Sequence, residues 1–78
     1  MNNLEKYKKV FMQTFDISEE ILNDLKYQDI EQWDSVGHMS MIGALEEEFD
    51  IMMEMDDIID FSSFKKGLET LSKYDVDI

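Results

Sequence analysis

The chain of 78 residues contains no cysteine, no proline and no arginine. Without cysteine it has neither a disulfide nor a thiolate metal ligand, so such a short chain depends on its own core for stability. No apolar run approaches the roughly 20 residues of a membrane-spanning helix, and the N-terminus lacks the apolar stretch of a signal peptide. Hydrophobic residues nevertheless make up 44% of the total, enough for a small core. We therefore expect a single domain over residues 1–78, monomeric and cytoplasmic.

Positive charge is also scarce. Seven lysines stand against nineteen acidic residues, and the formal net charge is −12. Residues 27–64 hold eleven acids and no lysine. Such a surface repels phosphate backbones and anionic lipid, so we expect neither nucleic acid nor membrane as a partner. It would speed encounter with a basic patch on another protein, although the same charge is also compatible with a role in solubility alone.

Hydrophobic periodicity predicts four helical segments and no strand pair. The expected ranges are about Asn3 to Phe15, from after Asp34 to near Asp50, about Asp56 to Asp60, and from after Ser62 or Ser63 to near Tyr74. Residues 16–33 have no sustained period and are predicted to form a long connection, with a short helix capped by Ser18. The predicted class is all-α, a small four-helix bundle with three longer helices and a short third helix. The expected core consists of Leu4, Phe11, Phe15, Ile42, Leu45, Phe49, Phe64, Leu68 and Leu71.

The second predicted helix carries two different faces. The arc that faces the core on a helical wheel consists of His38, Met41, Ile42, Leu45 and Phe49. Val36 and Met39 fall on the other, exposed side, within about a turn of Ser35. The acids Glu46 and Glu47 lie further along that exposed side. An apolar contact followed by acidic residues is a pattern that suits a partner with a basic rim.

Ser35 directly follows Asp34 at the start of this helix. If Asp34 is the cap, the hydroxyl of Ser35 remains free, and the helix N-terminus favours an attached phosphate. However, Asp-Ser before an apolar run is usually only a helix start, because both residue types are common caps. Periodicity alone modestly favours this plainer interpretation.

The stretch "WDSVGHMSMIGALEEEFDI", residues 33–51, resembles the modification-site helix of the acyl carrier protein and peptidyl carrier protein family. In that family an Asp-Ser-Leu-type motif precedes a helix that typically ends in Glu-Glu-Phe-type sequence. The order and lengths of the segments are similar over most of the chain. The resemblance implies that Ser35 carries a covalent 4′-phosphopantetheine, transferred from coenzyme A by a phosphopantetheinyl transferase. The thiol of this arm would hold acyl or aminoacyl groups as thioesters, and the chain would be a carrier and not an enzyme.

The resemblance also implies contacts with partner enzymes. Asp34 would help the transferase to recognise the chain, and Val36 and Met39 would touch partners on either side of the arm. Glu46 and Glu47 would meet basic patches on the enzymes that load and transfer the acyl or aminoacyl group. These five positions and Ser35 are the site residues that the sequence predicts.

Departures from the family pattern favour a specialised, free-standing carrier over a housekeeping role in fatty acid synthesis. Gln32 and Trp33 stand where carriers of fatty acid synthesis usually have a Leu-Gly pair, and Val36 replaces the usual leucine. Two alternatives remain open. One is an aminoacyl or peptidyl carrier, and the other, from a different class, is an unmodified acidic helical adaptor that binds a basic protein.

Other residue types allow plainer interpretations. His38, the only histidine, is predicted to be hydrogen-bonded at the edge of the core, and no catalytic residue is assigned. The acidic run at residues 54–60 lacks the ligand spacing of a calcium loop, so no metal site is expected. The methionines of residues 52–55 are predicted to fill gaps beneath a loop. Trp33 either packs against the second helix or shields the arm.

Overall fold

The computed structural model describes all of residues 1–78 and contains four α-helices and no strand. The helices are α1 (Asn3–Phe15), α2 (Ser35–Phe49), α3 (Met55–Asp60) and α4 (Phe64–Ser72), and a 3₁₀ turn η1 (Glu19–Ile21) lies between α1 and α2. The predicted all-α bundle, with its long first connection and short third helix, is confirmed. The last helix ends at Ser72, slightly before the predicted end near Tyr74. None of the helices is long and apolar enough to span a membrane.

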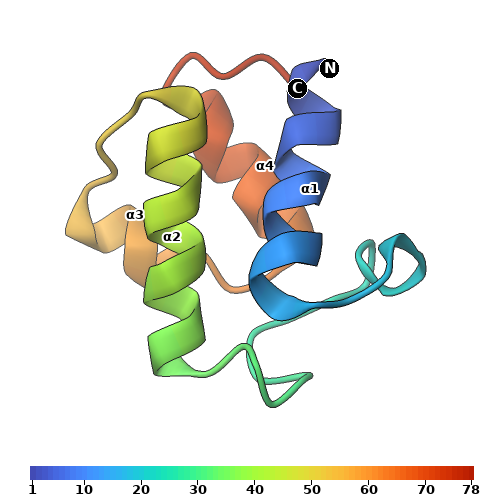
Figure 1. Cartoon of the computed structure of the whole chain (residues 1–78). Coiled ribbons are helices and arrows are strands. Elements are labelled where there is room, and N and C mark those ends of the chain that lie inside the picture. The colour runs from blue at the N-terminus through green and yellow to red at the C-terminus, as the bar shows by residue number, and fades with distance from the viewer.

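The two long helices form one side of the molecule. Figure 1 shows α1 and α2 side by side and running in opposite directions, with α4 crossing behind them and α3 beside α2. The two termini lie close together, and the side-chain amide of Asn3 donates a hydrogen bond to the backbone carbonyl of Asp77 at 3.0 Å. This arrangement places the start of α2 next to the long connection and next to α3.

Capping residues account for where the longer helices begin. The side chains of Asn2, Asp34 and Ser63 accept hydrogen bonds from the N–H groups of Glu5, Gly37 and Lys66, at 2.8, 2.8 and 2.9 Å. The predicted short helix is the 3₁₀ turn, and Ser18 is at its N-cap position as expected, but the Ser18 side chain makes no capping hydrogen bond. The turn that follows Ser18 has three residues and lies at the surface, where water can satisfy its N–H groups.

The same tripeptide, Phe-Asp-Ile, ends both long helices, at residues 15–17 and 49–51. In each case the aspartate is left-handed, with φ of 54° at Asp16 and 53° at Asp50. The next isoleucine N–H then turns back onto a carbonyl of the last helical turn, at 3.2 Å for Ile17 and 3.0 Å for Ile51. Glycine usually occupies this position, since an L side chain there is strained.

Twelve of the buried side chains are almost completely inaccessible, and aromatic rings dominate among them. The ring of Phe11 lies 5.0 Å from Tyr7, 5.1 Å from Phe64 and 5.4 Å from Trp33, measured between centroids. Of the predicted core residues, Phe11, Phe15, Ile42, Leu45, Phe64 and Leu71 are buried, and Phe49 and Leu68 are partly buried. Leu4 does not join this core, because it lies one turn beyond Tyr7, outside the aromatic layer.

A glycine allows α4 to pack closely on this aromatic layer. A Cβ atom on Gly67 would lie 2.1 Å from the hydroxyl oxygen of Tyr7 and 2.2 Å from Cζ of Phe61. The Tyr7 hydroxyl donates to the carbonyl of Phe64 at 2.7 Å, and burial raises the pKa of this phenol. The close approach therefore permits a buried hydrogen bond that ties α1 to the start of α4.

The long connection is held against the bundle at several points. Leu22 and Leu25 are buried, while Ile21 and Tyr27 are 42% and 36% exposed. The N–H of Tyr27 donates to the carbonyl of Ser62, and the carbonyl of Leu25 accepts from the N–H of Phe64, both at 2.9 Å. The connection is thus fixed to the segment between α3 and α4.

The left-handed ends of the helices generate a stability prediction. We expect Asp16→Gly to raise the free energy of unfolding by about 1 kcal/mol, because glycine adopts positive φ without steric cost. Urea denaturation would measure the change. Asp16→Ala is the control, since it removes the same charge but keeps Cβ; an equal gain in that variant would show that charge and not conformation is responsible.

Candidate functional site

In the first turn of α2, the hydroxyl of Ser35 has no hydrogen-bond partner within the protein. The Gly37 N–H donates to Oδ1 of Asp34 at 2.8 Å, and the backbone carbonyl of Asp34 accepts the N–H of His38 at 2.7 Å. Asp34 is therefore the N-cap, as the sequence predicted. Ser35 is exposed, and its side chain makes no hydrogen bond within the protein. Its oxygen is available for chemistry at the N-terminal end of a helix of 15 residues.

Gly37 allows the preceding loop to lie directly on this first turn. A Cβ atom at position 37 would be 1.8 Å from the carbonyl oxygen of Gln32. The side-chain amide of Gln32 in turn donates to the carbonyl of Phe15, at 3.1 Å, at the end of α1. The loop that leads into Asp34 is consequently fixed from both sides.

His38 joins three parts of the chain. The indole N–H of Trp33 donates to Nδ1 of His38 at 2.9 Å, and Nε2 of His38 lies 2.8 Å from the carbonyl oxygen of Ile58 in α3. An indole N–H can only donate, so Nδ1 is the acceptor and the ring proton is on Nε2, which donates to Ile58. The prediction of a hydrogen-bonded histidine at the core edge is confirmed. We call this chain of two bonds the Trp33–His38–Ile58 bridge.

The structure also decides between the two interpretations of Trp33. Its side chain is fully buried and stacks on Phe15, with centroids 5.4 Å apart and ring planes at 24°. The indole therefore packs between α1 and α2 as part of the core. It is not at the surface, where it would shield an attached arm.

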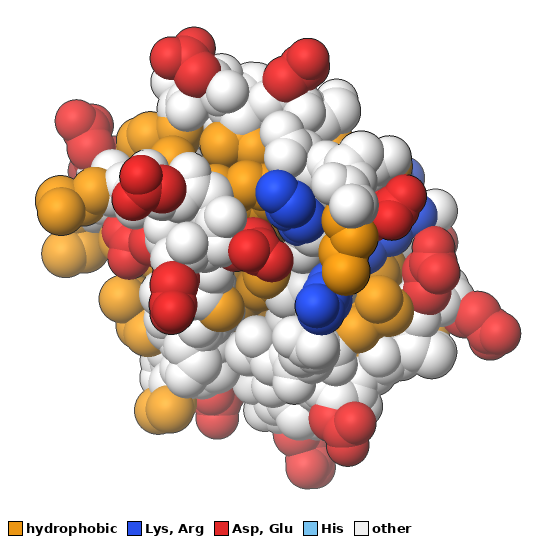
Figure 2. All heavy atoms as spheres, turned by 45° about the horizontal axis from the view of Figure 1, so that its top comes forward, with side chains coloured by type: hydrophobic (Ala, Val, Ile, Leu, Met, Phe, Trp, Pro, Cys, Tyr) orange, Lys and Arg blue, Asp and Glu red, His pale blue; other side chains and the backbone are white.

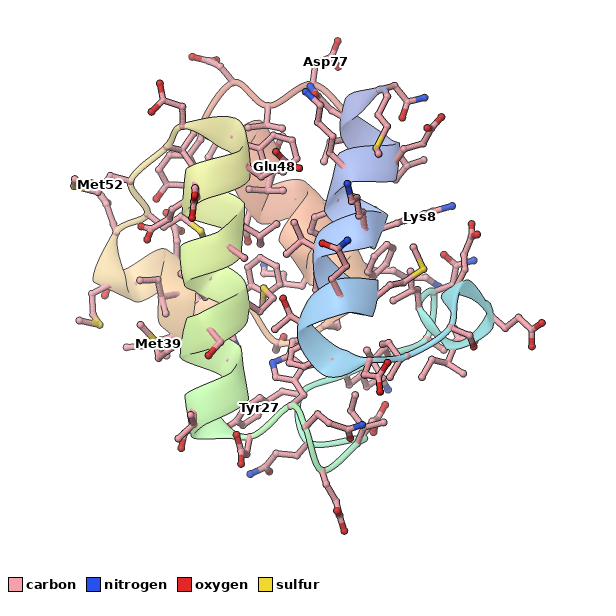
Figure 3. The ribbon with its side chains drawn as sticks, in the orientation of Figure 1. Lys8, Tyr27, Met39, Glu48, Met52 and Asp77 are labelled. Atoms are coloured by element: carbon pink, nitrogen blue, oxygen red, sulfur yellow. The ribbon has the colours of Figure 1, made fainter.

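A half-open cavity of about 320 Å³ lies between α2 and α3, with Ser35 in its wall. The lining residues are Tyr27, Ser35, His38, Met39, Met55, Ile58, Ile59, Phe61 and Ser62. Figure 3 shows Met39 on the side of α2 that faces α3, and Tyr27 next to the first turn of α2. Six of the nine lining residues are hydrophobic, so the cavity suits an apolar group next to the Ser35 hydroxyl.

Exposed hydrophobic side chains surround the same region. They are Val36 (74% exposed), Met39 (53%), Met52 (85%), Met55 (68%) and Ile59 (69%), and we call these five the exposed apolar surface. Figure 2 shows hydrophobic side chains gathered on the side of the molecule where α3 lies, and Met52 projects outward in Figure 3. The prediction that the three methionines fill gaps is wrong for Met52 and Met55. Of the three, only Met53 is buried, and its backbone N–H donates to the carboxylate of Glu46.

The two predicted acidic contacts differ in their surroundings. The carboxylate of Glu46 accepts the N–H of Met53 at 2.9 Å, so it fixes the connection between α2 and α3. Glu47 is exposed and makes neither a hydrogen bond nor an ion pair within the protein. The ion pairs of the molecule are Lys8–Glu19, Lys65–Asp24, Lys66–Glu69 and Lys73–Asp57. The acids of α2 thus have no lysine of the same chain to neutralise them.

The N-terminal end of α3 is attached to the end of α4. The Tyr74 hydroxyl donates to Asp57 and accepts the N–H of Glu54, and Lys73 Nζ lies 3.1 Å from Asp57. The hydrogen bonds from Tyr74 and Lys73 hold the pKa of the Asp57 carboxyl below its ordinary value and raise the pKa of both partners. Because α3 has no fully buried residue of its own, these contacts help to keep the wall of the cavity in place.

Comparison with curated proteins identifies the family. The chain is 33% identical over 75 residues to the acyl carrier protein of Buchnera aphidicola subsp. Acyrthosiphon pisum (strain Tuc7), a match that covers 94% of each chain. It is 34% identical over 74 residues to the acyl carrier protein of Buchnera aphidicola subsp. Schizaphis graminum (strain Sg), covering 92% of this chain and 94% of the relative. The chain belongs to the acyl carrier protein family. No family model and no solved structure matches it.

Membership of the acyl carrier protein family supports a carrier role for this chain. The structure agrees with a carrier in one respect that sequence reasoning missed, namely the cavity beside Ser35. Its α3 residues lie in the acidic segment for which the sequence predicts only a short helix and no metal site. The adjacent apolar residues Ile58 and Ile59 were the available signal. No group of three or more His, Cys, Asp or Glu side chains is placed to hold a metal ion.

The capping geometry of α2 predicts that substitutions at Asp34 and Ser35 lower the free energy of unfolding by different amounts. Asp34→Ala should lower the free energy of unfolding by about 1 kcal/mol, because the Gly37 N–H loses its partner. Ser35→Ala should cost well under that amount, because the Ser35 hydroxyl has no partner to lose. Urea denaturation of both variants measures the difference. A larger loss in Ser35→Ala than in Asp34→Ala would contradict the assignment of the cap.

The contacts of Asp57 predict a dependence on pH. Its pKa is lower in the folded state, so its contacts stabilise the fold above the ordinary aspartate value of about 3.9 and are lost as the pH falls through the folded value. Asp57→Asn should therefore lower the melting temperature at neutral pH, and the gap to the wild type should close in acid. Asp56→Asn, at an exposed neighbour without these partners, is the control. A gap that stays constant from neutral to acid pH would contradict the assignment.

Proposed function

We propose that this chain carries acyl groups as thioesters on a 4′-phosphopantetheine arm attached to Ser35. The observation that carries the proposal is the unoccupied Ser35 hydroxyl, which lies at an exposed helix N-terminus and in the wall of an apolar cavity. Membership of the acyl carrier protein family supports the same function. A single domain over residues 1–78, monomeric and cytoplasmic, is part of this proposal.

The residues around Ser35 fit an attached phosphodiester. The free N–H groups and the positive end of the α2 dipole favour an anion there. The Asp34 carboxylate is a neighbouring negative charge, but Oδ1 is engaged by the Gly37 N–H. In the transfer reaction the Ser35 oxygen bonds to the phosphorus that carries pantetheine in coenzyme A, adenosine 3′,5′-bisphosphate leaves, and a base of the transferase takes the serine proton. The arm supplies the thiol that this cysteine-free chain lacks.

The cavity gives the cargo a partial shelter from water. Its hydrophobic lining would bury part of an acyl chain, and the free energy gained scales with the apolar area removed from water. Tyr27 and Ser62 contribute hydroxyl groups that make no hydrogen bond within the protein. The cavity is therefore also compatible with a cargo that has one polar group, including the aminoacyl group of the alternative carrier function.

Partner enzymes are proposed to dock on the exposed apolar surface. Val36 and Met39 lie next to Ser35, and methionines adapt to partners of different shape. Glu47 is free to pair with a basic rim, and Glu46 remains a proposed contact although one of its oxygens holds Met53. Asp34 is proposed to be recognised by the transferase. Departures at Gln32 and Trp33 support a specialised, free-standing carrier.

The proposal is tested by intact-protein mass after incubation with coenzyme A and a promiscuous phosphopantetheinyl transferase. We expect the wild type to gain one phosphopantetheine and Ser35→Ala to gain none. Ser40→Ala is the matched control, because Ser40 is also exposed on α2 but lies outside the cavity wall, and it should be modified like the wild type.

A folded wild-type protein that gains no mass, while a known carrier is modified in the same assay, would contradict the proposal. The unmodified acidic adaptor would then become the favoured function. Equal gains by the wild type and Ser35→Ala would place the modification at another residue.

A further inference from the structure

The ring of His38 forms part of the inner wall of the cavity beside Ser35, together with the buried side chain of Phe61. The His38 ring is also in contact with aromatic residues of the interior. Its centroid lies 6.2 Å from Trp33, with the planes at 13°, and 6.0 Å from Phe61. Both of those side chains are almost completely inaccessible to solvent. His38 and Phe61 therefore separate the cavity from the rest of the aromatic core.

The position of the His38 ring in this wall is fixed by hydrogen bonds. Both ring nitrogens of His38 are hydrogen-bonded, to Trp33 and to Ile58. Rotating the ring away would leave an indole N–H and a carbonyl without partners in the interior, and burying one or two more methylenes does not offset that loss. Met39, Met55 and Ile59 on the outer side are exposed and have room to adjust. A longer cargo would extend outward and not into the core.

We infer that His38 is a specificity-determining residue, which limits the sheltered cargo to acyl groups of short to medium length. The identity of the cargo rests on the proposed function, but the depth of the cavity does not. A cavity of about 150 Å³ is known to hold a six-carbon ring, so about 320 Å³ corresponds to at most about twelve carbons. Because the cavity is half-open, part of that volume lies at its mouth, and we place the limit between about six and about twelve carbons.

The absence of cysteine allows a test that needs no transferase. Ser35→Cys creates the only thiol in the chain, to which alkyl groups from methyl to hexadecyl are attached as disulfides with alkyl methanethiosulfonates. We expect the melting temperature to rise with each added carbon, by up to roughly 3 to 6 °C, until the limit is reached and then to stop rising. Ser40→Cys with the same alkyl groups is the positional control and should show no rise with length.

Two substitutions at position 38 then test the role of the ring. In the Ser35→Cys background, His38→Ala removes the ring and the two hydrogen bonds, while His38→Phe removes the hydrogen bonds and keeps a ring. We expect the limit to move to longer chains in His38→Ala and to stay in place in His38→Phe. His38→Asn, a smaller side chain that keeps a donor and an acceptor, replaces His38→Ala in this comparison if the latter does not fold.

Three results would overturn the inference. They are a melting temperature that continues to rise up to hexadecyl in Ser35→Cys, one that does not rise with length at all, and a limit that is the same with a small side chain and with phenylalanine at position 38. The alkyl groups are attached chemically, so the limit is measured whether or not Ser35 is a substrate of the transferase. Failure of this inference is thus distinguishable from failure of the proposed function.

Discussion

The Trp33–His38–Ile58 bridge is the interaction on which the rest of the site depends. Through two hydrogen bonds, one imidazole ring connects the long connection, α2 and α3. Trp33 also stacks on Phe15, so the bridge extends to α1. Because a chain of this size has only a small core, and α3 buries no residue completely, a polar link at the core edge has a large structural effect. It sets the position of α3 relative to Ser35, and therefore the shape of the cavity.

Two helical glycines lie where another part of the chain approaches the helix backbone too closely for a Cβ atom. At Gly37 the carbonyl of Gln32 occupies the space of a Cβ atom, and at Gly67 the rings of Tyr7 and Phe61 do so. Each glycine lowers the stability of its helix by about 1 kcal/mol relative to alanine, and the contact that it permits offsets this loss. Gly43 has no such neighbour, and nothing in the structure explains it. The two close contacts belong to the aromatic core and to the loop that presents Ser35.

The lysines of α1 and the exposed apolar surface lie on different sides of the molecule. Lys8 lies on α1 and forms an ion pair with Glu19, and Figure 2 shows lysines on that side. The α2 and α3 side has the exposed apolar surface and acids such as Glu47 that have no internal partner. The exposed hydrophobic side chains and unpaired acids of this side do not stabilise the fold of the chain itself. They suit contact with a partner that carries a basic patch.

The sequence by itself determined the four helices and the cap at Asp34 that leaves the Ser35 hydroxyl free, because these depend on side chains a few residues apart. It did not determine which residues of the connections enter the core. Trp33 lies outside the helices, where no periodicity marks a buried face, and only tertiary packing places it against Phe11. The cavity likewise needs α3 to lie next to α2, and the contact of His38 with Ile58, 20 residues further along the chain, exists only in the folded state.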